Sequence, residues 1–139
     1  MNVDRDRIRQ DLEAINSFNA SPGTGITRFT FSGEYEQARA YVTDEMRKTG
    51  ARPAITLGGN TRCRLTGTGD EPAVMAGSHL DTVLHGGRYD GVAGVVAALE
   101  AARVIRENNL RHRHPIDVVV FAEEEGARFG SVMTGSRAW

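Results

Sequence analysis

Residues 72–122 contain three apolar segments, which read PAVMAG at 72–77, GVAGVVAALEAARVIR at 91–106 and IDVVVFA at 116–122. The first is short and bounded by turn residues, which predicts a buried strand, whereas the second is long and rich in Ala, Val and Leu, which predicts a helix. The third is β-branched on consecutive residues, as in a strand covered on both faces. Strand, helix and strand in this order form a βαβ unit with parallel strands. The sequence therefore predicts an α/β fold, with helices in three αβα layers around a mostly parallel sheet.

The segments before this unit add two helices and a hairpin to the prediction. Four apolar residues near the N-terminus recur at helical spacing: Ile8, Leu12, Ile15 and Phe18. Residues 20–25 (ASPGTG) break this helix, and a second is expected to begin at Ser32 or Gly33 and to end at Gly50. Its buried stripe is predicted to contain Tyr35, Ala38, Val42 and Met46. Strand-like residues 54–57 and 62–65 flank a Gly-Gly-Asn turn, which predicts a hairpin.

Length, charge and cysteine content limit the number of domains and the kinds of partner that this protein is expected to have. A chain of 139 residues suits one domain. The formal net charge is -1, with acidic and basic residues interspersed, so no charge pattern favours nucleic acid or an anionic membrane as a partner. Cys63 is the single cysteine, and the N-terminus is charged rather than apolar, so we expect a cytoplasmic protein without a signal peptide. The apolar runs are too short to span a bilayer.

Two polar clusters interrupt the apolar framework before the long helix. His79 and Asp81 follow the first predicted strand, and residues two apart in an extended chain point to the same side. A carboxylate beside an imidazole is a common partner of a metal-bound histidine, although His-x-Asp alone also fits an ordinary polar turn. Asp90, in GGRYDG at 86–91, could reach a metal or simply cap the helix, and Gly91 would allow a close approach.

A third cluster, Glu123-Glu124-Glu125, follows the second predicted strand. Three adjacent acids are usually a solvated patch, but open α/β sheets place ligand sites at the carboxyl ends of their strands. Carboxylates crowded there would be neutralised by divalent cations. Because all three clusters fall on one sheet edge, His79 and the acids form a ligand set suited to zinc or manganese.

Residues 77–83 (GSHLDTV), 86–91 (GGRYDG) and 121–129 (FAEEEGARF) together resemble the hydantoinase/carbamoylase branch of the aminoacylase-like metallopeptidase superfamily. The branch includes N-carbamoyl-L-amino acid hydrolase, allantoate amidohydrolase and β-ureidopropionase. Residues 25–29 (GITRF) and the Gly59-Asn60 turn are also similar to it, so the resemblance runs along nearly the whole chain. The separations of 11 residues between His79 and Asp90, and of 35 between Asp90 and Glu125, are those of the family.

The resemblance implies a role for each site residue. His79 would bind one divalent ion, Asp90 would bridge two, and Glu125 would bind the second. Glu124 would act as the general base that activates water, and Asp81 would orient His79. The implied reaction is metal-dependent hydrolysis of C–N bonds in linear carbamoyl or ureido compounds, with zinc or manganese, or alternatively cobalt or nickel, as the ions. The implied partners are a small-molecule substrate and, for a full-length protein, a second subunit in a homodimer.

The sequence also departs from the family. Members are longer and contribute two downstream histidine ligands and a lid-like dimerisation domain. We therefore expect residues 1–139 to be the N-terminal portion of the catalytic domain, and the isolated chain to have little or no hydrolytic activity. His85 could be an opportunistic ligand or a plain loop residue, and His112 and His114, in a basic segment, are expected to be solvated. Two alternatives stay open: a metallo-aminopeptidase or dipeptidase, against which Arg128-Phe129 argues mildly, and an inactive assembly or regulatory module.

Overall fold

Residues 2–139, which the computed structural model describes, form four helices and four strands. In chain order these are α1 (Arg5–Ser17), α2 (Gly33–Lys48), β1 (Arg52–Ile55), β2 (Thr61–Leu65), β3 (Val74–His79), α3 (Val92–Glu107), β4 (Ile116–Phe121) and α4 (Thr134–Arg137). Helix α4, the last helix of the described chain, was not predicted. Among the described residues, every helix is too short or too polar to cross a membrane.

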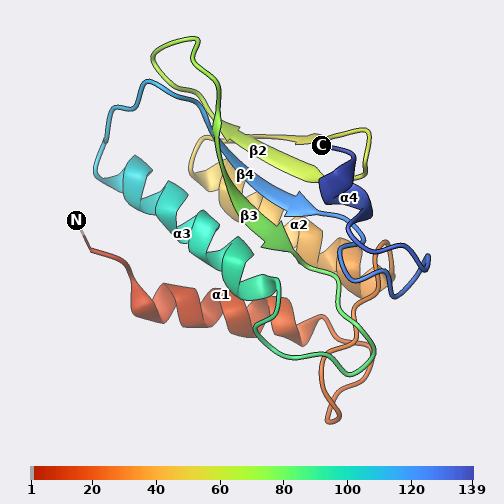
Figure 1. Ribbon diagram of the computed structural model, residues 1–139. Coiled ribbons are helices and arrows are strands. Elements are labelled where there is room, and N and C mark those ends of the chain that lie inside the picture. Colours follow the sequence, from red (N-terminus) through yellow and green to blue (C-terminus); the bar gives the residue numbers. More distant parts are fainter. Residues whose placement is uncertain (1) are drawn as a thin grey trace.

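The four strands form one sheet in the order β1-β2-β4-β3. Strands β3 and β4 pair in parallel and are joined by α3, which confirms the predicted βαβ unit (Figure 1). The other two pairings are antiparallel, so the sheet is mixed where the sequence predicted a mostly parallel one. The predicted hairpin accounts for part of this difference, because the short turn between β1 and β2 can join only antiparallel neighbours.

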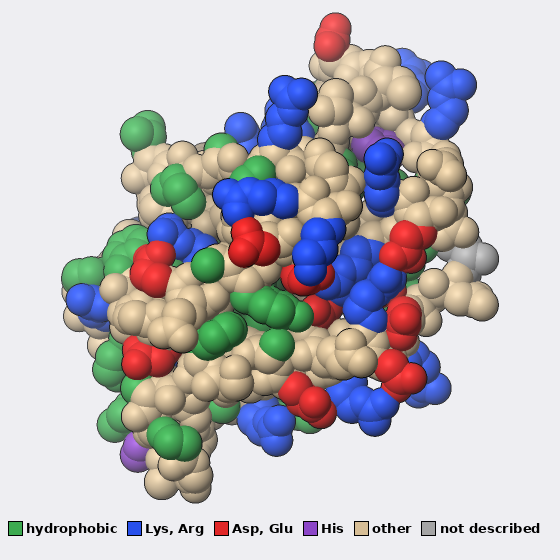
Figure 2. Space-filling model, turned by 180° about the vertical axis from the view of Figure 1, so that it is seen from behind, with side chains coloured by type: hydrophobic (Ala, Val, Ile, Leu, Met, Phe, Trp, Pro, Cys, Tyr) green, Lys and Arg blue, Asp and Glu red, His purple; other side chains and the backbone are tan. Residues whose placement is uncertain are grey.

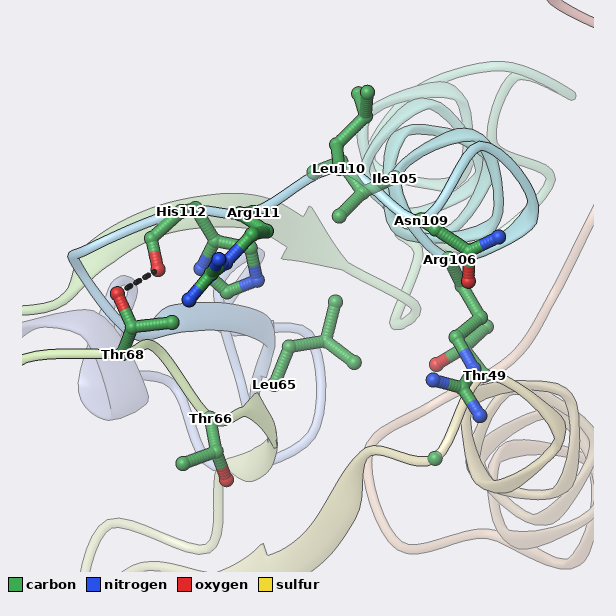
Figure 3. A pocket seen from close by; sticks show the side chains of 11 residues that line it. Thr49, Leu65, Thr66, Thr68, Ile105, Arg106, Asn109, Leu110, Arg111 and His112 are labelled. Carbon is green, nitrogen blue, oxygen red and sulfur yellow. Dashed lines mark hydrogen bonds between the residues drawn. The ribbon is translucent and has the colours of Figure 1, made fainter.

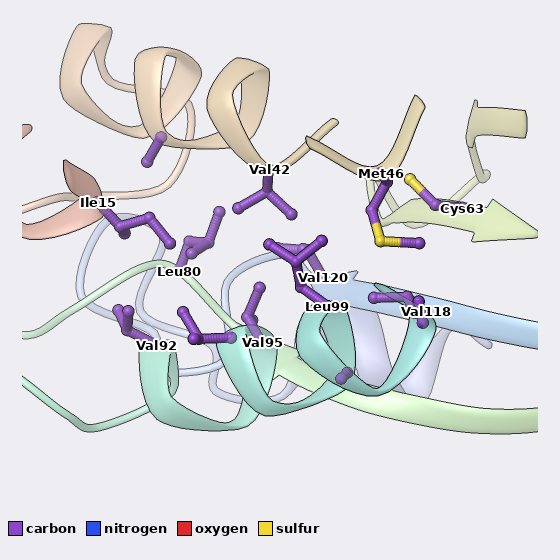
Figure 4. Close-up of a cluster of buried hydrophobic side chains, with 14 of the residues drawn as sticks. Ile15, Val42, Met46, Cys63, Leu80, Val92, Val95, Leu99, Val118 and Val120 are labelled. Atoms are coloured by element: carbon purple, nitrogen blue, oxygen red, sulfur yellow. The ribbon is translucent and has the colours of Figure 1, made fainter. Parts of the chain in front are cut away.

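The core lies between one face of the sheet and helices α1–α3 (Figure 4). The buried stripe of α2 is the predicted one, and Ile15 of α1 is buried with it. Side chains from β2 and β4, among them Cys63 and Val118, meet the helices from the sheet. On the opposite face lie α4 and Trp139, whose ring lies edge-on to Phe121 at 6.0 Å between centroids. The α/β class is confirmed, and the second helical layer is represented here by α4.

Strand β3 corrects the prediction of a buried strand at 72–77. It begins two residues later than expected, and it lies at the edge of the sheet, where Val74 and Met75 are 55% and 45% exposed. An apolar run predicts a strand but not its place in the sheet. Strand β4, between β2 and β3, is buried as predicted. Charged side chains of both signs are interspersed on the surface seen in Figure 2, in line with the near-neutral net charge.

Candidate metal centre

The predicted polar clusters meet at one edge of the sheet because of its topology. Strands β3 and β4 run in the same direction, and their last residues, His79 and Phe121, are paired in register. The turns that follow both strands therefore leave the sheet side by side. Helix α3 starts at this edge and runs back along β3, so the loop at its N-terminus lies at the same edge as the two turns (Figure 1).

Three predicted ligands lie together at this edge. One possible ligand atom from each of His79, Asp90 and Glu125 lies within 4.8 Å of the other two. The Nε2 atom of His79 is 3.7 Å from an Oδ1 of Asp90. His79 is buried, Glu125 is half-buried and Asp90 is exposed. The convergence expected from the βαβ unit is thus present, and the role of these residues as metal ligands stays a prediction.

The His79 ring is held by main chain rather than by a carboxylate. Its Nδ1 lies 2.9 Å from the carbonyl oxygen of Asp81, whereas the Asp81 carboxylate is 3.7 Å away. Since a carbonyl only accepts hydrogen bonds, Nδ1 must carry the proton. In a neutral ring this leaves the lone pair on Nε2, which is the atom nearest to Asp90. Asp81 therefore contacts the His79 ring through its backbone, and its role in orienting His79 stays a prediction.

The Asp81 carboxylate has a different task. Its Oδ2 accepts a hydrogen bond of 3.0 Å from the main-chain N–H of Glu125, which ties the turn after β3 to the turn after β4. Burial raises the pKa of the Asp81 carboxyl, against the opposing effects of the Glu125 N–H and of His79. Asp81 thus fixes the relative position of His79 and Glu125.

The alternative role of Asp90 as a helix cap is not what the structure shows. The N-cap of α3 is Gly91, at φ +68°, and no side chain caps the helix. The Asp90 carboxylate is therefore left free at the surface. A Cβ atom at position 91 would lie 2.5 Å from the His79 carbonyl oxygen and 2.6 Å from its ring. The close approach expected at Gly91 is confirmed, and the residue that approaches is His79, through both its carbonyl oxygen and its ring.

The three acids after β4 face different partners. Glu123 is buried, adopts a left-handed backbone at φ +54°, and accepts hydrogen bonds from the N–H groups of Arg128 and Phe129 at 3.1 and 2.7 Å. Glu124 accepts a hydrogen bond of 2.8 Å from the hydroxyl of Ser136 in α4. No sequence pattern predicts either contact, since both depend on how residues 126–136 fold back. Glu123 organises the loop, and Ser136 holds the predicted general base.

Among residues 2–139, the acidic side chains of this edge lack a Lys or Arg partner. In the part of the chain that the structure describes, no Lys or Arg side chain lies within ion-pair distance of Asp90, Glu124 or Glu125. Burial is the main cause that raises the pKa of Glu125, and the charges of Asp90 and Asp81 add to it while His79 opposes it. A nitrogen donor beside uncompensated carboxylates fits a divalent cation in both charge and donor chemistry.

The remaining histidines lie outside this group. His85 is an exposed loop residue and does not belong to the cluster of possible ligands. His112 lies at the opposite end of the sheet, where it lines a cavity of about 430 Å³ with Leu65, Ile105 and Leu110, among others (Figure 3). The Nδ1 atoms of His112 and His114 lie 2.7 and 2.8 Å from main-chain carbonyls. His112 is partly covered, whereas His114 is exposed as predicted.

Comparison with known proteins gives concordant matches. The model of "Peptidase family M28" matches residues 60–139. The chain is 43% identical to an N-carbamoyl-L-amino-acid amidohydrolase of Paenarthrobacter aurescens over 96% of its own length and 32% of the relative's. It is 34% identical to an allantoate amidohydrolase of Bacillus subtilis, over 95% of this chain and 32% of the relative. A hydantoinase/carbamoylase family amidase from Burkholderia ambifaria has a similar structure, with a TM-score of 0.92 and 32% sequence identity. The match covers 96% of this chain and 33% of the amidase. The chain thus spans about a third of the length of these relatives.

Proposed function

Because this chain belongs to peptidase family M28, we propose that His79, Asp90 and Glu125 are the metal ligands of a hydrolase that cleaves C–N bonds in linear carbamoyl or ureido compounds. The observation that supports this most is the convergence of the three side chains from separate segments. The resemblance to the carbamoylase branch is confirmed by relatives named as amidohydrolases of N-carbamoyl-L-amino acids and of allantoate.

Each residue of the site has a chemical task in this proposal. His79 offers the lone pair of Nε2, because the Asp81 carbonyl holds the proton on Nδ1. The exposed carboxylate of Asp90 would bridge two ions, and Glu125 would be the third ligand that this chain contributes. Two divalent ions, zinc or manganese and alternatively cobalt or nickel, would lower the pKa of water and stabilise negative charge on the substrate oxygen. Glu124, held by the Ser136 hydroxyl, takes a proton from water and delivers it to the leaving nitrogen.

Peptide hydrolysis is a second candidate, favoured by the description of the matching family as a peptidase. The two functions differ in the group that is cleaved, so they are separated by comparing N-carbamoyl amino acids with dipeptides as substrates. Higher kcat/KM on dipeptides would replace the proposed function by the second candidate.

Several broader features belong to the same proposal. We expect a small-molecule substrate, a homodimer and a cytoplasmic location for the active protein. We also propose that residues 1–139 are the N-terminal portion of its catalytic domain, with the remaining metal ligands supplied from elsewhere. The share of about a third that the chain covers in its relatives supports this arrangement.

Calorimetric titration of Zn²⁺ or Mn²⁺ into the chain tests the site directly. His79→Ala removes a ligand and is expected to weaken binding by about 10- to 100-fold or more. The matched control is His112→Ala, at the opposite end of the sheet, which is expected to bind like the wild type. Identical heats for the wild type and His79→Ala would remove the metal assignment.

A further inference from the structure

Arg28 is a fully buried arginine that contacts the turn after β3. It is 0% exposed, and its Nε donates a hydrogen bond of 2.7 Å to the carbonyl oxygen of Leu80. Its Nη1 donates to the carbonyl oxygens of Ile15 and Phe18, at 2.9 and 3.0 Å. Burying a guanidinium is costly, and burial lowers the pKa of Arg28 to about 10 while Asp81 opposes this effect. The arginine thus uses Nε and Nη1 on main-chain carbonyls, whereas Nη2 is buried without a hydrogen-bond partner among the described residues.

The backbone of the same segment holds the other side of the turn. The N–H of Arg28 donates to the hydroxyl oxygen of Thr82 at 2.9 Å, and the N–H of Thr82 donates to the carbonyl oxygen of Arg28 at 3.0 Å. The Thr82 hydroxyl in turn donates to the carbonyl oxygen of Ile26, at 3.0 Å. Residues 80 and 82 are therefore both fixed by Arg28. Between them lies Asp81, whose carbonyl holds the proton-bearing nitrogen of His79.

We propose that Arg28 is a positioning residue that sets the orientation and the tautomer of His79 from behind the turn. Its side chain fixes the peptide before Asp81 and its backbone fixes the residue after it, so the Asp81 carbonyl can point only at Nδ1. Nε2 is then presented to Asp90 and Glu125. The effect on metal affinity rests on the proposed function, but the effect on the ring does not.

The chemistry of the side chain explains why arginine is needed. The planar guanidinium donates from Nε and Nη1 in two fixed directions, which is how it reaches Leu80 on one side and Ile15 and Phe18 on the other. A lysine ammonium at the same place is a single point and cannot span both groups. Arg28→Lys should therefore keep the charge but lose the geometry.

Imidazole nitrogen NMR on the metal-free chain measures the predicted tautomer. In the wild type we expect the signals of a single Nδ1–H tautomer for His79, and in Arg28→Lys a mixture of both tautomers. The matched control is Arg103→Lys, since Arg103 is also buried, at 7% exposed, but contacts acids of the helices rather than the turn. It should lower the unfolding midpoint and leave the His79 signals unchanged. Wild-type His79 signals in folded Arg28→Lys would overturn the proposal.

Two further measurements complete the test. If Arg28→Lys does not fold by circular dichroism, Thr82→Val removes the hydroxyl that accepts from the Arg28 N–H and donates to Ile26, and leaves the bond from the Thr82 N–H to the Arg28 carbonyl. Unchanged His79 signals in that variant overturn the proposal equally. Titration of Zn²⁺ should show an affinity about tenfold lower in Arg28→Lys than in Arg103→Lys. If His79→Ala leaves Zn²⁺ binding intact, the proposed metal site fails, and the NMR result still decides the role of Arg28.

Discussion

Carboxylates gather in two regions of this molecule, and only one region supplies them with cations. The helix network consists of Arg7, Asp11, Glu45, Glu100 and Arg103 between α1, α2 and α3. In it Arg103 donates to Asp11 and to Glu45, the latter at 2.7 Å, and Arg7 donates to Glu100 at 2.8 Å. The acidic rim consists of the acids Asp81, Asp90, Glu124 and Glu125 beside His79. Its acids have no Lys or Arg partner among residues 2–139.

The pKa values of the acids move in opposite directions in the two regions. Burial alone would raise the pKa of Glu45 and of Glu100, but hydrogen bonds from Lys48 and Arg103 to the first, and from Arg7 to the second, lower both. In the acidic rim burial prevails, and the pKa of Glu125 is raised. The helix network therefore stabilises the fold, whereas the acidic rim keeps charge that a bound cation would neutralise.

The largest expected effect comes from removing the arginine that joins the three helices. Arg103→Met leaves the carboxylates of Asp11 and Glu45 without their main cation in a buried place. Breaking such a buried pair costs about 3–5 kcal/mol of unfolding free energy, which urea denaturation measures. Metal affinity of the folded variant should not change. A loss below about 1 kcal/mol would show that the network does not stabilise the fold.

Glu125→Gln, in the acidic rim, is expected to act in the opposite sense on stability. It removes a charge that Asp90 and Asp81 disfavour, so the unfolding free energy should stay the same or rise by up to about 1 kcal/mol. Zn²⁺ affinity should fall by at least about 10- to 100-fold, because a ligand is lost and losing even the hydrogen-bonding partner of a ligand costs that much. Urea denaturation and calorimetry on the same variant measure both. A loss of stability as large as that of Arg103→Met would erase the distinction between the regions.

The pH dependence of stability should separate the regions further. The lowered pKa values of Glu45 and Glu100 give stability that is present above about pH 4.5, the ordinary glutamate value, and lost as the pH falls through their folded pKa values. The raised pKa of Glu125 acts oppositely, since its ionised form is disfavoured as the pH rises. From pH 3 to 7, the unfolding free energy of the wild type should increasingly exceed that of Arg103→Met. Over the same range it should fall increasingly below that of Glu125→Gln. Parallel curves for wild type and both variants would contradict these assignments.

The smallest effect is expected from an exposed pair outside both regions. Asp44 and Arg47 are an i,i+3 ion pair on α2 with side chains 64% and 57% exposed. Solvent screens such pairs, so Asp44→Asn should change the unfolding free energy by less than about 0.5 kcal/mol. A larger loss would mean that an ion pair stabilises this fold whether or not it is buried, so burial would not explain the effect of the helix network.

Local periodicity predicted most of the fold. The stripe of α2, the hairpin and the βαβ unit follow from spacing that a single segment carries, and all three are present. The edge position of β3 and the antiparallel pairing of β2 with β4 depend on which strands meet, so no single segment could reveal them. The short helix α4 has too few residues to show a helical period.

The candidate site was predictable to the level of the topology. Parallel strands ending in His79 and in the acids must bring them to one edge, and α3 brings Asp90 there. The finer contacts depend on backbone angles and on side-chain directions that a pattern does not encode. They include the contacts of the Asp81 carbonyl with the His79 ring, of Ser136 with Glu124, and of Arg28 with Leu80. In the sequence, Arg28 stood out only as part of residues 25–29, which resemble the family.

Anomalous diffraction from a crystal of the chain grown with Zn²⁺ would locate the cation that the acidic rim is expected to hold. We predict an anomalous peak about 2.0–2.2 Å from Nε2 of His79 and from a carboxylate oxygen of Asp90 or Glu125. Peaks found only at His85, His112 or His114, with the acidic rim empty, would contradict the account.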